Sequence, residues 1–182
     1  HPLPPPRPAD APVVFGSFNN AMKLSPSTLQ LWARVLLAVP ASRLLLKAPS
    51  LRDETVCASL AQHLGELGIA KDRLAFRGPT GLAEMMQEYG DIDVALDPVP
   101  YNGGTTTLQA LWMGVPVVTL AGGNFCARMG ASVMNALGRP DAVAEDAEGY
   151  VAIAARLAAA ASAARPERAG ARARITATPL GD

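Results

Sequence analysis

A loop rich in glycine and threonine stands between an apolar strand and an amphipathic helix in DPVPYNGGTTTLQALWMGVPVVTL, residues 97–120. Gly103 and Gly104 allow backbone conformations closed to other residues and let another molecule approach the main chain closely. Thr105 and Thr106 place hydroxyl and N–H groups in the first turn of a helix, where the helix dipole favours an anion. A tight turn with one threonine cap is the simpler alternative. Three consecutive threonines are more than one cap needs, so the stretch favours an anion site.

A lysine supplies charge of the complementary sign. Lys23 comes shortly after the apolar run VVFGSF, so it lies at the carboxyl end of the first expected strand. Its ammonium is a compact point charge that reaches a phosphate, although a single lysine is more often an exposed, solvated charge. Paired with the helix start at 104–106, it predicts a site for a phosphate or diphosphate without a metal. The sequence has no GxGxxG after the first strand and no GxxxxGK[ST], which disfavours a dinucleotide site and a P-loop.

Composition excludes several other classes of protein. The 182 residues have a formal net charge of zero, so no basic field favours nucleic acid. We expect no membrane partner and a cytoplasmic location, because there is neither an apolar run of roughly 18 residues nor a secretory signal. Cys57 and Cys126 are isolated, and the two histidines are His1 and His63, which leaves little material for a zinc site or a hydrolase triad. We therefore expect no metal and no cofactor.

The elements that must position these groups alternate along the chain. Residues 1–12 hold six prolines and are expected to be an extended, proline-rich linker rather than a packed element. Beyond it, strands are predicted at 13–18, 43–48, 73–78, 92–97, 115–120 and 141–144. Helices are predicted at 26–39, 53–67, 81–90, from 105 and at 127–137, followed by one final helix in the Ala- and Arg-rich C-terminal region. This alternation predicts an α/β domain over 13–182 with a doubly wound parallel sheet covered on both faces. The loops after strands one, three, four and five then meet at one edge, where such sheets bind ligands.

Three segments carry a resemblance to a known family. FGSFNNAMKLSPSTLQLWARVLLAVPASRLLLK, RLAFRGP and LDPVPYNGGTTTLQALWMGVPVVTLAG resemble the C-terminal lobe of the O-linked N-acetylglucosamine transferases, which include the plant SPINDLY proteins and bacterial relatives. The similarity runs from about residue 13 to residue 137 and continues more weakly through ARITATPLGD. It implies a Rossmann-like nucleotide-sugar-binding lobe of the GT-B architecture. It also implies an N-terminal catalytic lobe and tetratricopeptide repeats in the same protein, both absent from this chain.

The resemblance assigns roles to residues already singled out. Lys23 matches the family lysine that contacts the donor diphosphate, and is the candidate catalytic residue. Asn20 matches a neighbouring polar contact. Thr105 and Thr106 match the two threonines whose helix start holds the phosphates, which agrees with the electrostatic argument from the residues.

The nucleoside end of the donor is matched less closely. Thr80, in FRGPTG, falls where the family recognises the base through main-chain groups. Gln109 stands where family members carry an acid that binds the ribose, and a neutral amide can both donate and accept. Gly104 and Leu82 replace a histidine and a lysine of the animal enzymes. These departures leave two donors open, UDP-N-acetylglucosamine (UDP-GlcNAc), which we favour, and GDP-fucose.

The resemblance implies a glycosyltransferase that transfers the sugar to Ser or Thr hydroxyls of acceptor proteins, with inversion and without a metal. A GT-B lobe acting on a small molecule or glycan, and a catalytically silent nucleotide-binding module, are the alternatives. No plausible catalytic base lies in the loops, so we expect this chain to be inactive alone. The missing initiator Met indicates that it begins inside a longer protein.

Overall fold

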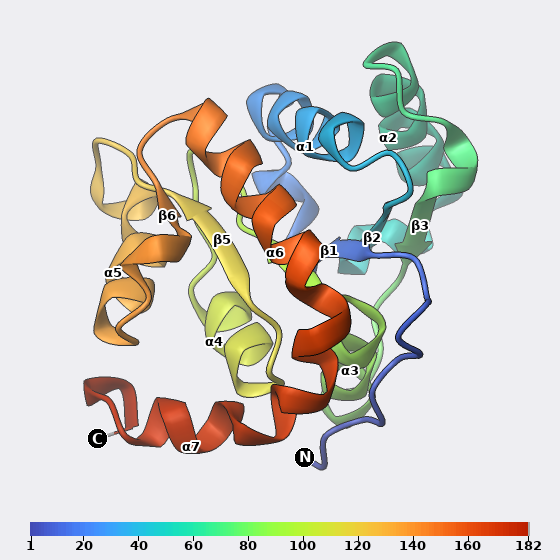
Figure 1. Cartoon of the computed structure of the whole chain (residues 1–182). Coiled ribbons are helices and arrows are strands. Elements are labelled where there is room, and N and C mark those ends of the chain that lie inside the picture. The colour runs from blue at the N-terminus through green and yellow to red at the C-terminus, as the bar shows by residue number, and fades with distance from the viewer. Residues whose placement is uncertain (182) are drawn as a thin grey trace.

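The computed structural model describes residues 1–181, and within them six parallel strands form one sheet (Figure 1). The sheet order is β3-β2-β1-β4-β5-β6, so β1 pairs with both β2 and β4 at the centre. The strands are β1 (Val14–Ser17), β2 (Arg43–Lys47), β3 (Leu74–Arg77), β4 (Val94–Leu96), β5 (Val117–Leu120) and β6 (Val143–Ala144). All six predicted strands are present, each shorter than its apolar run because the ends of the runs enter the loops.

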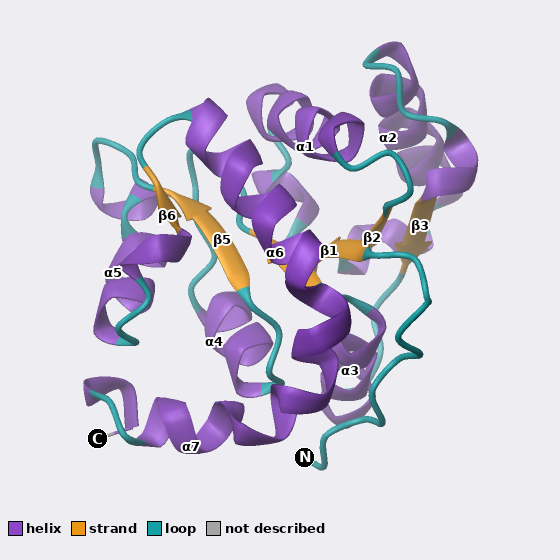
Figure 2. Cartoon of the chain, viewed as in Figure 1, coloured by secondary structure: helices purple, strands orange, loops and turns teal. Residues whose placement is uncertain are grey.

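Helices cover both faces of the sheet, which confirms the doubly wound α/β fold (Figure 2). The helices are α1 (Pro26–Ala38), α2 (Glu54–Glu66), α3 (Leu82–Glu88), α4 (Thr105–Trp112), α5 (Met129–Ala136), α6 (Ala147–Glu167) and α7 (Ala171–Thr176). One core contains Trp32 of α1 and Tyr150 of α6, and the other contains Met86 of α3 and Leu111 of α4. Side chains alternate between the two cores along β1, β2, β4, β5 and β6, as a sheet buried on both faces requires. On the edge strand β3 only Leu74 and Phe76 pack against a core, and Ala75 is exposed.

Local sequence signals set the helix ends. Ser25 caps α1, its hydroxyl accepting from the amide of Thr28 at 3.2 Å, and Pro26 occupies the first helical position. Gly114 follows the last turn of α4 with φ of +75°, a left-handed conformation that favours glycine. The turn that aims β5 back into the sheet therefore depends on this residue.

The Ala- and Arg-rich C-terminal region is not one helix. It forms α6 and α7, separated by a short 3-10 segment at Arg168–Gly170. Pro166 has no N–H to donate within the helix, and Gly170 is a poor helix former, so the chain turns here. As a result α7 packs beneath α4 instead of extending α6 (Figure 1).

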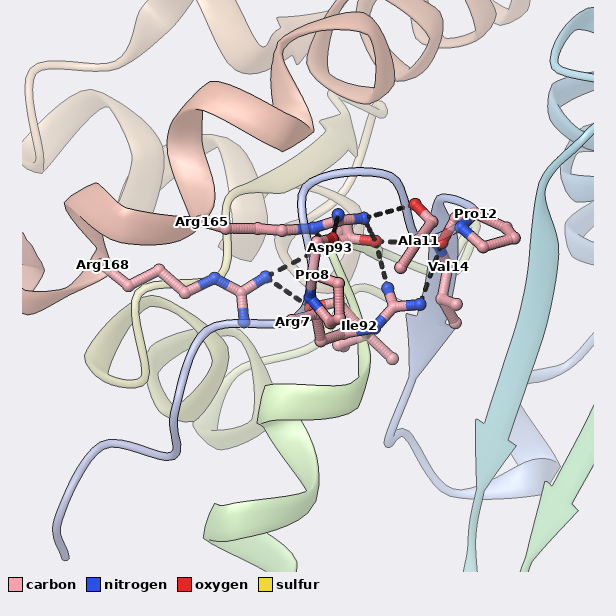
Figure 3. A network of polar contacts seen from close by, with 9 residues as sticks. All are labelled: Arg7, Pro8, Ala11, Pro12, Val14, Ile92, Asp93, Arg165 and Arg168. Atoms are coloured by element: carbon pink, nitrogen blue, oxygen red, sulfur yellow. Dashed lines mark hydrogen bonds and ion pairs between the residues drawn. The ribbon is translucent and has the colours of Figure 1, made fainter.

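Asp93, just before β4, is surrounded by three arginines (Figure 3). Arg165 of α6 donates to its carboxylate at 2.8 and 3.0 Å, and Arg7 donates at 2.5 Å. The guanidinium of Arg168 lies 3.6 Å away, and the amide of Val14 donates at 2.9 Å. This cluster joins the N-terminal segment, the amino ends of β1 and β4, and the end of α6.

Residues 1–12 contain no helix or strand, yet they pack against the domain. Arg165 donates to the carbonyl oxygens of Pro8 and Ala11 as well as to Asp93, and the ring of Pro4 fills the space beside Gly90. The expectation that this segment is not a packed element is therefore wrong in part, because Arg165 gives its carbonyls a partner. Its role as a linker stays a prediction. Over residues 1–181, no helix combines the length and the apolar character needed to cross a membrane.

Candidate functional site

The candidate site lies at the carboxyl edge of the sheet, between β1 and β4. These neighbouring strands send their connections to opposite faces, because the sheet order reverses there. In doubly wound sheets the loops at such a switch point separate and leave room for a ligand. The loop after β1 carries Lys23, and the loop after β4 leads to the threonines of α4.

Lys23 reaches across this switch point. It ends a one-turn 3-10 helix, η1 (Ala21–Lys23), which Asn20 caps by accepting from the amide of Met22 at 3.0 Å. The Lys23 Nζ donates to the carbonyl oxygen of Asn102 at 2.9 Å and lies 4.3 Å from the centre of the Tyr101 ring. Burial lowers the pKa of Lys23 below its ordinary value, against the opposing influence of nearby acidic groups. The structure thus brings Lys23 to the loop that begins α4, and gives Asn20 a local capping role.

The start of α4 offers unused hydrogen-bond donors. Gly104 is its N-cap residue and has no side chain to cap the helix. Within the described residues, the amides of Gly104, Thr105 and Thr106 have no hydrogen-bond acceptor. The Thr105 side chain is exposed, whereas the Thr106 hydroxyl donates to Oδ1 of Asn19 at 2.9 Å. Open amides at the positive end of a helix dipole are the arrangement that binds phosphate.

Gly103 has a different role from the one its sequence context suggests. Its amide donates to Oδ1 of Asp97 at 2.6 Å, so it points into the protein and not toward an anion. Its φ is not positive, but a Cβ at this position would lie 2.6 Å from the hydroxyl oxygen of Thr107 and 2.7 Å from that of Thr106. Glycine is needed here because the protein's own side chains leave no space.

Asp97 is a residue of the site that the sequence argument did not single out. It is 2% exposed, its Oδ2 accepts from the Thr119 hydroxyl at 2.6 Å, and its carbonyl oxygen accepts from the Tyr150 hydroxyl at 2.9 Å. Burial raises the pKa of Asp97 to about 7, although the bonds from Thr119 and Gly103 and the charge of Lys23 favour the ionised form. The sequence signal that could have identified Asp97 is a carboxylate directly after the apolar run VAL.

Two asparagines were also missed. Asn19, next to the predicted Asn20, is buried and is the residue that contacts α4. Asn102 is fully buried, and its side chain donates to the carbonyl of Pro98 at 3.0 Å and accepts from the amide of Gly130 at 3.3 Å. It therefore ties the loop after β4 to α5.

The loop at 78–81, after β3, carries Thr80 on its exposed tip. The Thr80 hydroxyl lies 3.4 Å from the carboxylate of Glu88, at the end of α3. Lys47, at the end of β2, is 4% exposed; its Nζ lies 2.6 Å from the same carboxylate and donates to the Gly78 carbonyl at 2.8 Å. The Lys47–Glu88 ion pair thus contacts the loop at its start, Gly78, and at Thr80.

Gln109 lies one turn along α4 from Thr105. Both line a groove of about 390 Å³ between α4 and α7, together with the apolar side chains of Leu108 and Trp112. Gln109 is half-buried and is one of the polar residues that line this groove. Thr105 and Gln109 therefore belong to one surface, as a ligand running along the first turns of α4 would require.

The parallel sheet with strand order 3-2-1-4-5-6 and an uncapped helix start at its switch point defines a Rossmann-like domain. Comparison with known proteins places this domain among the lobes of GT-B glycosyltransferases. The sequence profile of glycosyl transferase family 41 matches residues 6–181, and the chain belongs to that family. The resemblance inferred from the sequence motifs is confirmed.

Individual relatives are similar at 35–39% identity. The rice protein described as "Probable UDP-N-acetylglucosamine--peptide N-acetylglucosaminyltransferase SPINDLY" is 36% identical over 171 residues, which cover 93% of this chain and 18% of the relative. The UDP-N-acetylglucosamine--peptide N-acetylglucosaminyltransferase of Caenorhabditis elegans is 35% identical over 149 residues, covering 81% of this chain and 13% of the relative.

A solved structure is similar over most of the chain. A mutant of the Thermobaculum terrenum O-GlcNAc transferase matches with a TM-score of 0.88 and 39% identity, over 96% of this chain and 34% of the other. The chain thus spans less than a fifth of the two curated relatives and about a third of the solved chain.

Proposed function

We propose that this chain is the donor-binding lobe of a protein O-GlcNAc transferase. In this proposal it binds UDP-GlcNAc for inverting, metal-independent transfer of the sugar to Ser or Thr hydroxyls of acceptor proteins. The observation that carries the proposal is the meeting of Lys23 with the loop that begins the uncapped helix α4. The names of the relatives, which are 35–39% identical to the chain over the aligned residues, support the same activity.

The chemistry asked of the lobe is stabilisation of a leaving group. As the bond between the sugar and the β-phosphate breaks, negative charge accumulates on the departing diphosphate. The Lys23 ammonium and the amides of Gly104, Thr105 and Thr106 supply positive charge and dipoles that are already oriented. The exposed Thr105 hydroxyl adds a donor. These groups make stabilisation by a metal ion unnecessary, so transfer should continue in the presence of a chelator.

The remaining contacts follow the length of a nucleoside diphosphate. Gln109 would bind the ribose from the groove along α4, and Asn20 would contribute beside Lys23. The Thr80 loop would hold the base. Leu82, which is 58% exposed, and Gly104 stand where the animal enzymes carry a lysine and a histidine. GDP-fucose is therefore the alternative donor.

The rest of the reaction belongs to other parts of the protein. His63 lies on α2 and His1 on the proline-rich segment, so neither is a base for the acceptor hydroxyl at this site. We propose that the N-terminal lobe supplies the base, that tetratricopeptide repeats present the acceptor, and that this chain alone is inactive. A small-molecule or glycan acceptor, and a silent nucleotide-binding module, are the alternatives.

The test compares the full-length protein with its Lys23→Ala variant. Transfer from UDP-GlcNAc and from GDP-fucose to protein acceptors is measured with and without EDTA. Loss of one charge-assisted contact in the cleft should cost about 2–4 kcal/mol, or roughly 30- to 1,000-fold in rate. Lys71→Ala is the matched control, because Lys71 is exposed and precedes β3 at the opposite end of the sheet.

Several outcomes discriminate among the alternatives. A folded Lys23→Ala protein that retains transfer within threefold of the parent contradicts the role of Lys23. Transfer from GDP-fucose alone corrects the donor, and nucleotide binding without any transfer supports the silent module. Transfer to glycans but not to proteins would show that the acceptor is a glycan and not a protein.

A further inference from the structure

A buried carboxylate lies directly beneath the proposed diphosphate site, and the mechanism above does not use it. Oδ1 of Asp97 accepts from the Gly103 amide and Oδ2 accepts from the Thr119 hydroxyl, both at 2.6 Å. Asp97 directly follows β4, in the loop that leads to the open amides of α4. A negative charge under an anion site opposes the ligand, so its presence there needs an explanation.

We propose that Asp97 is a positioning residue that shapes the diphosphate site and takes up a proton when the diphosphate binds. The inference rests on the proposed function, because it needs a nucleotide diphosphate at the start of α4. It adds a coupling between proton binding and donor binding.

The positioning argument begins with the Gly103 amide. Because Asp97 holds this N–H inside the protein, the next amides, from Gly104 onward, are the ones left open at the helix start. Asp97 itself cannot shift easily. Its carbonyl accepts from the Tyr150 hydroxyl at 2.9 Å, and that hydroxyl accepts from Nε1 of Trp32 at 3.2 Å, both rings being fully buried. The turn is thus anchored to the core under α6.

The coupling argument depends on the groups that face the carboxylate. They are the Gly103 amide, the Thr119 hydroxyl of β5, the Tyr150 hydroxyl of α6 and the charge of Lys23 from η1, with Cys126 acting on Lys23. Without a ligand, the two donors and Lys23 favour the ionised carboxylate, and burial disfavours it. A diphosphate diester brings two negative charges to Lys23 and the helix start, and so repels the charge on Asp97.

Binding the anion must therefore raise the proton affinity of Asp97, and by linkage protonation must raise the affinity for the anion. Burial already places the pKa of Asp97 at about 7 in the free protein. Below this pH the carboxyl is already neutral, and above it a proton must be taken up on binding. Affinity should therefore fall as the pH rises above 7, by at most roughly tenfold per pH unit for one proton.

The experiment is calorimetry on the full-length protein with UDP-GlcNAc, in pairs of buffers with different ionisation enthalpies, from pH 6 to 8.5. The diphosphate of this ligand is diesterified, so it has no group that titrates in this range. We expect an uptake of roughly 0.5–1 proton per ligand near pH 7.5 that declines toward pH 6. Asp97→Asn, which keeps an acceptor for the Gly103 amide but cannot take up a proton, should abolish both the uptake and the pH dependence of the affinity. His63→Gln, a substitution on α2, should retain both.

A second variant keeps the test independent of the folding of Asp97→Asn. Thr119→Val preserves side-chain shape but removes a donor to the carboxylate, so the pH at which proton uptake begins should rise. Binding of UDP-GlcNAc by the parent without proton uptake overturns the inference and leaves the proposed function intact. If the protein binds GDP-fucose with proton uptake and does not bind UDP-GlcNAc, the donor assignment changes but the proposed role of Asp97 is supported. Binding of neither nucleotide sugar overturns both proposals.

Discussion

At the scale of single residues, the two glycines before α4 differ in how closely other atoms surround them. Gly103 is enclosed by the hydroxyls of Thr106 and Thr107, whereas a Cβ on Gly104 would meet only the end of the Met129 side chain, at 2.9 Å. A flexible methionine can move aside at low cost, but two hydroxyls and a buried carboxylate cannot. The glycine that the site cannot replace is therefore Gly103.

A valine at position 103 should accordingly be far more harmful than an alanine at position 104. We expect Gly103→Val to destabilise the protein by about 1–3 kcal/mol through overpacking, and to remove most UDP affinity by displacing the turn. Gly104→Ala should change the unfolding midpoint only slightly. Thermal unfolding and calorimetry with UDP, on the full-length variants, measure both effects.

The exposed threonine gives a graded comparison in the same experiment. Thr105→Ser keeps the hydroxyl and the amide and should be mild, whereas Thr105→Ala should lose about 1–2 kcal/mol of binding free energy. The diphosphate anchor would lie elsewhere if Gly103→Val bound UDP as tightly as the parent. The same would follow if Thr105→Ser weakened UDP binding more than Gly103→Val does.

At the scale of elements, the sequence predicts what local patterns determine. Short apolar runs alternating with helical periods predicted the six strands and their two-sided burial, and capping residues predicted where α1 begins. For the candidate site, the sequence predicted that the loops carrying its residues lie at one edge of the sheet. Contacts between distant residues were not predictable in this way: Lys23 and the Asn102 carbonyl are separated by 79 positions, and Thr106 and Asn19 by 87. The roles of Asp97 and Lys47 were not predicted either, because they too depend on contacts that the local sequence pattern does not show.

The Lys47–Glu88 pair shows how one such contact can control a loop. Lys47→Met should leave the Glu88 carboxylate, 15% exposed, with Arg77 at 3.8 Å as its remaining cation, and should free the Gly78 carbonyl. We expect a loss of stability of about 3–5 kcal/mol. The Thr80 loop should loosen at its start, because the Gly78 carbonyl loses its donor.

Chemical denaturation measures the stability change, and the double variant Lys47→Met/Glu88→Leu should recover most of it, because no buried charge is then unpaired. Binding of UDP and of inorganic diphosphate by the full-length protein separates the loop from the phosphate site. UDP should weaken more than diphosphate in Lys47→Met. An equal loss for both ligands would show that the pair supports the domain as a whole and not the Thr80 loop.

At the scale of the whole molecule, the Asp93 cluster closes the fold at the edge opposite the site. It joins Arg7, from the N-terminal segment, to Arg165 near the end of the chain, across the starts of two central strands (Figure 3). Composition alone could not predict this: Asp93 is one of 16 acidic residues, and the proline-rich segment gives no periodic signal. Burial by itself would raise the pKa of Asp93, but the bonds from Arg165 and Val14 and the charge of Arg7 outweigh it and lower the pKa below its ordinary value of 3.8.

Removal of this carboxylate should therefore destabilise the entire domain, in a manner that depends on pH. Asp93→Asn leaves three arginines without their counter-charge, and should cost about 3–5 kcal/mol at pH 7. A carboxyl whose pKa is lower in the folded protein stabilises it fully above the unfolded pKa, and the contribution disappears as the pH falls through the folded pKa. The difference in stability between parent and variant should thus be constant near neutrality and shrink below about pH 3.8.

Arg34→Ala, which breaks the exposed pair with Glu148, is the control and should change the unfolding midpoint little. Urea denaturation across pH 3 to 7 provides the measurement. An Asp93→Asn protein as stable as the Arg34→Ala control at pH 7 would mean that the cluster does not hold the two ends of the chain to the sheet.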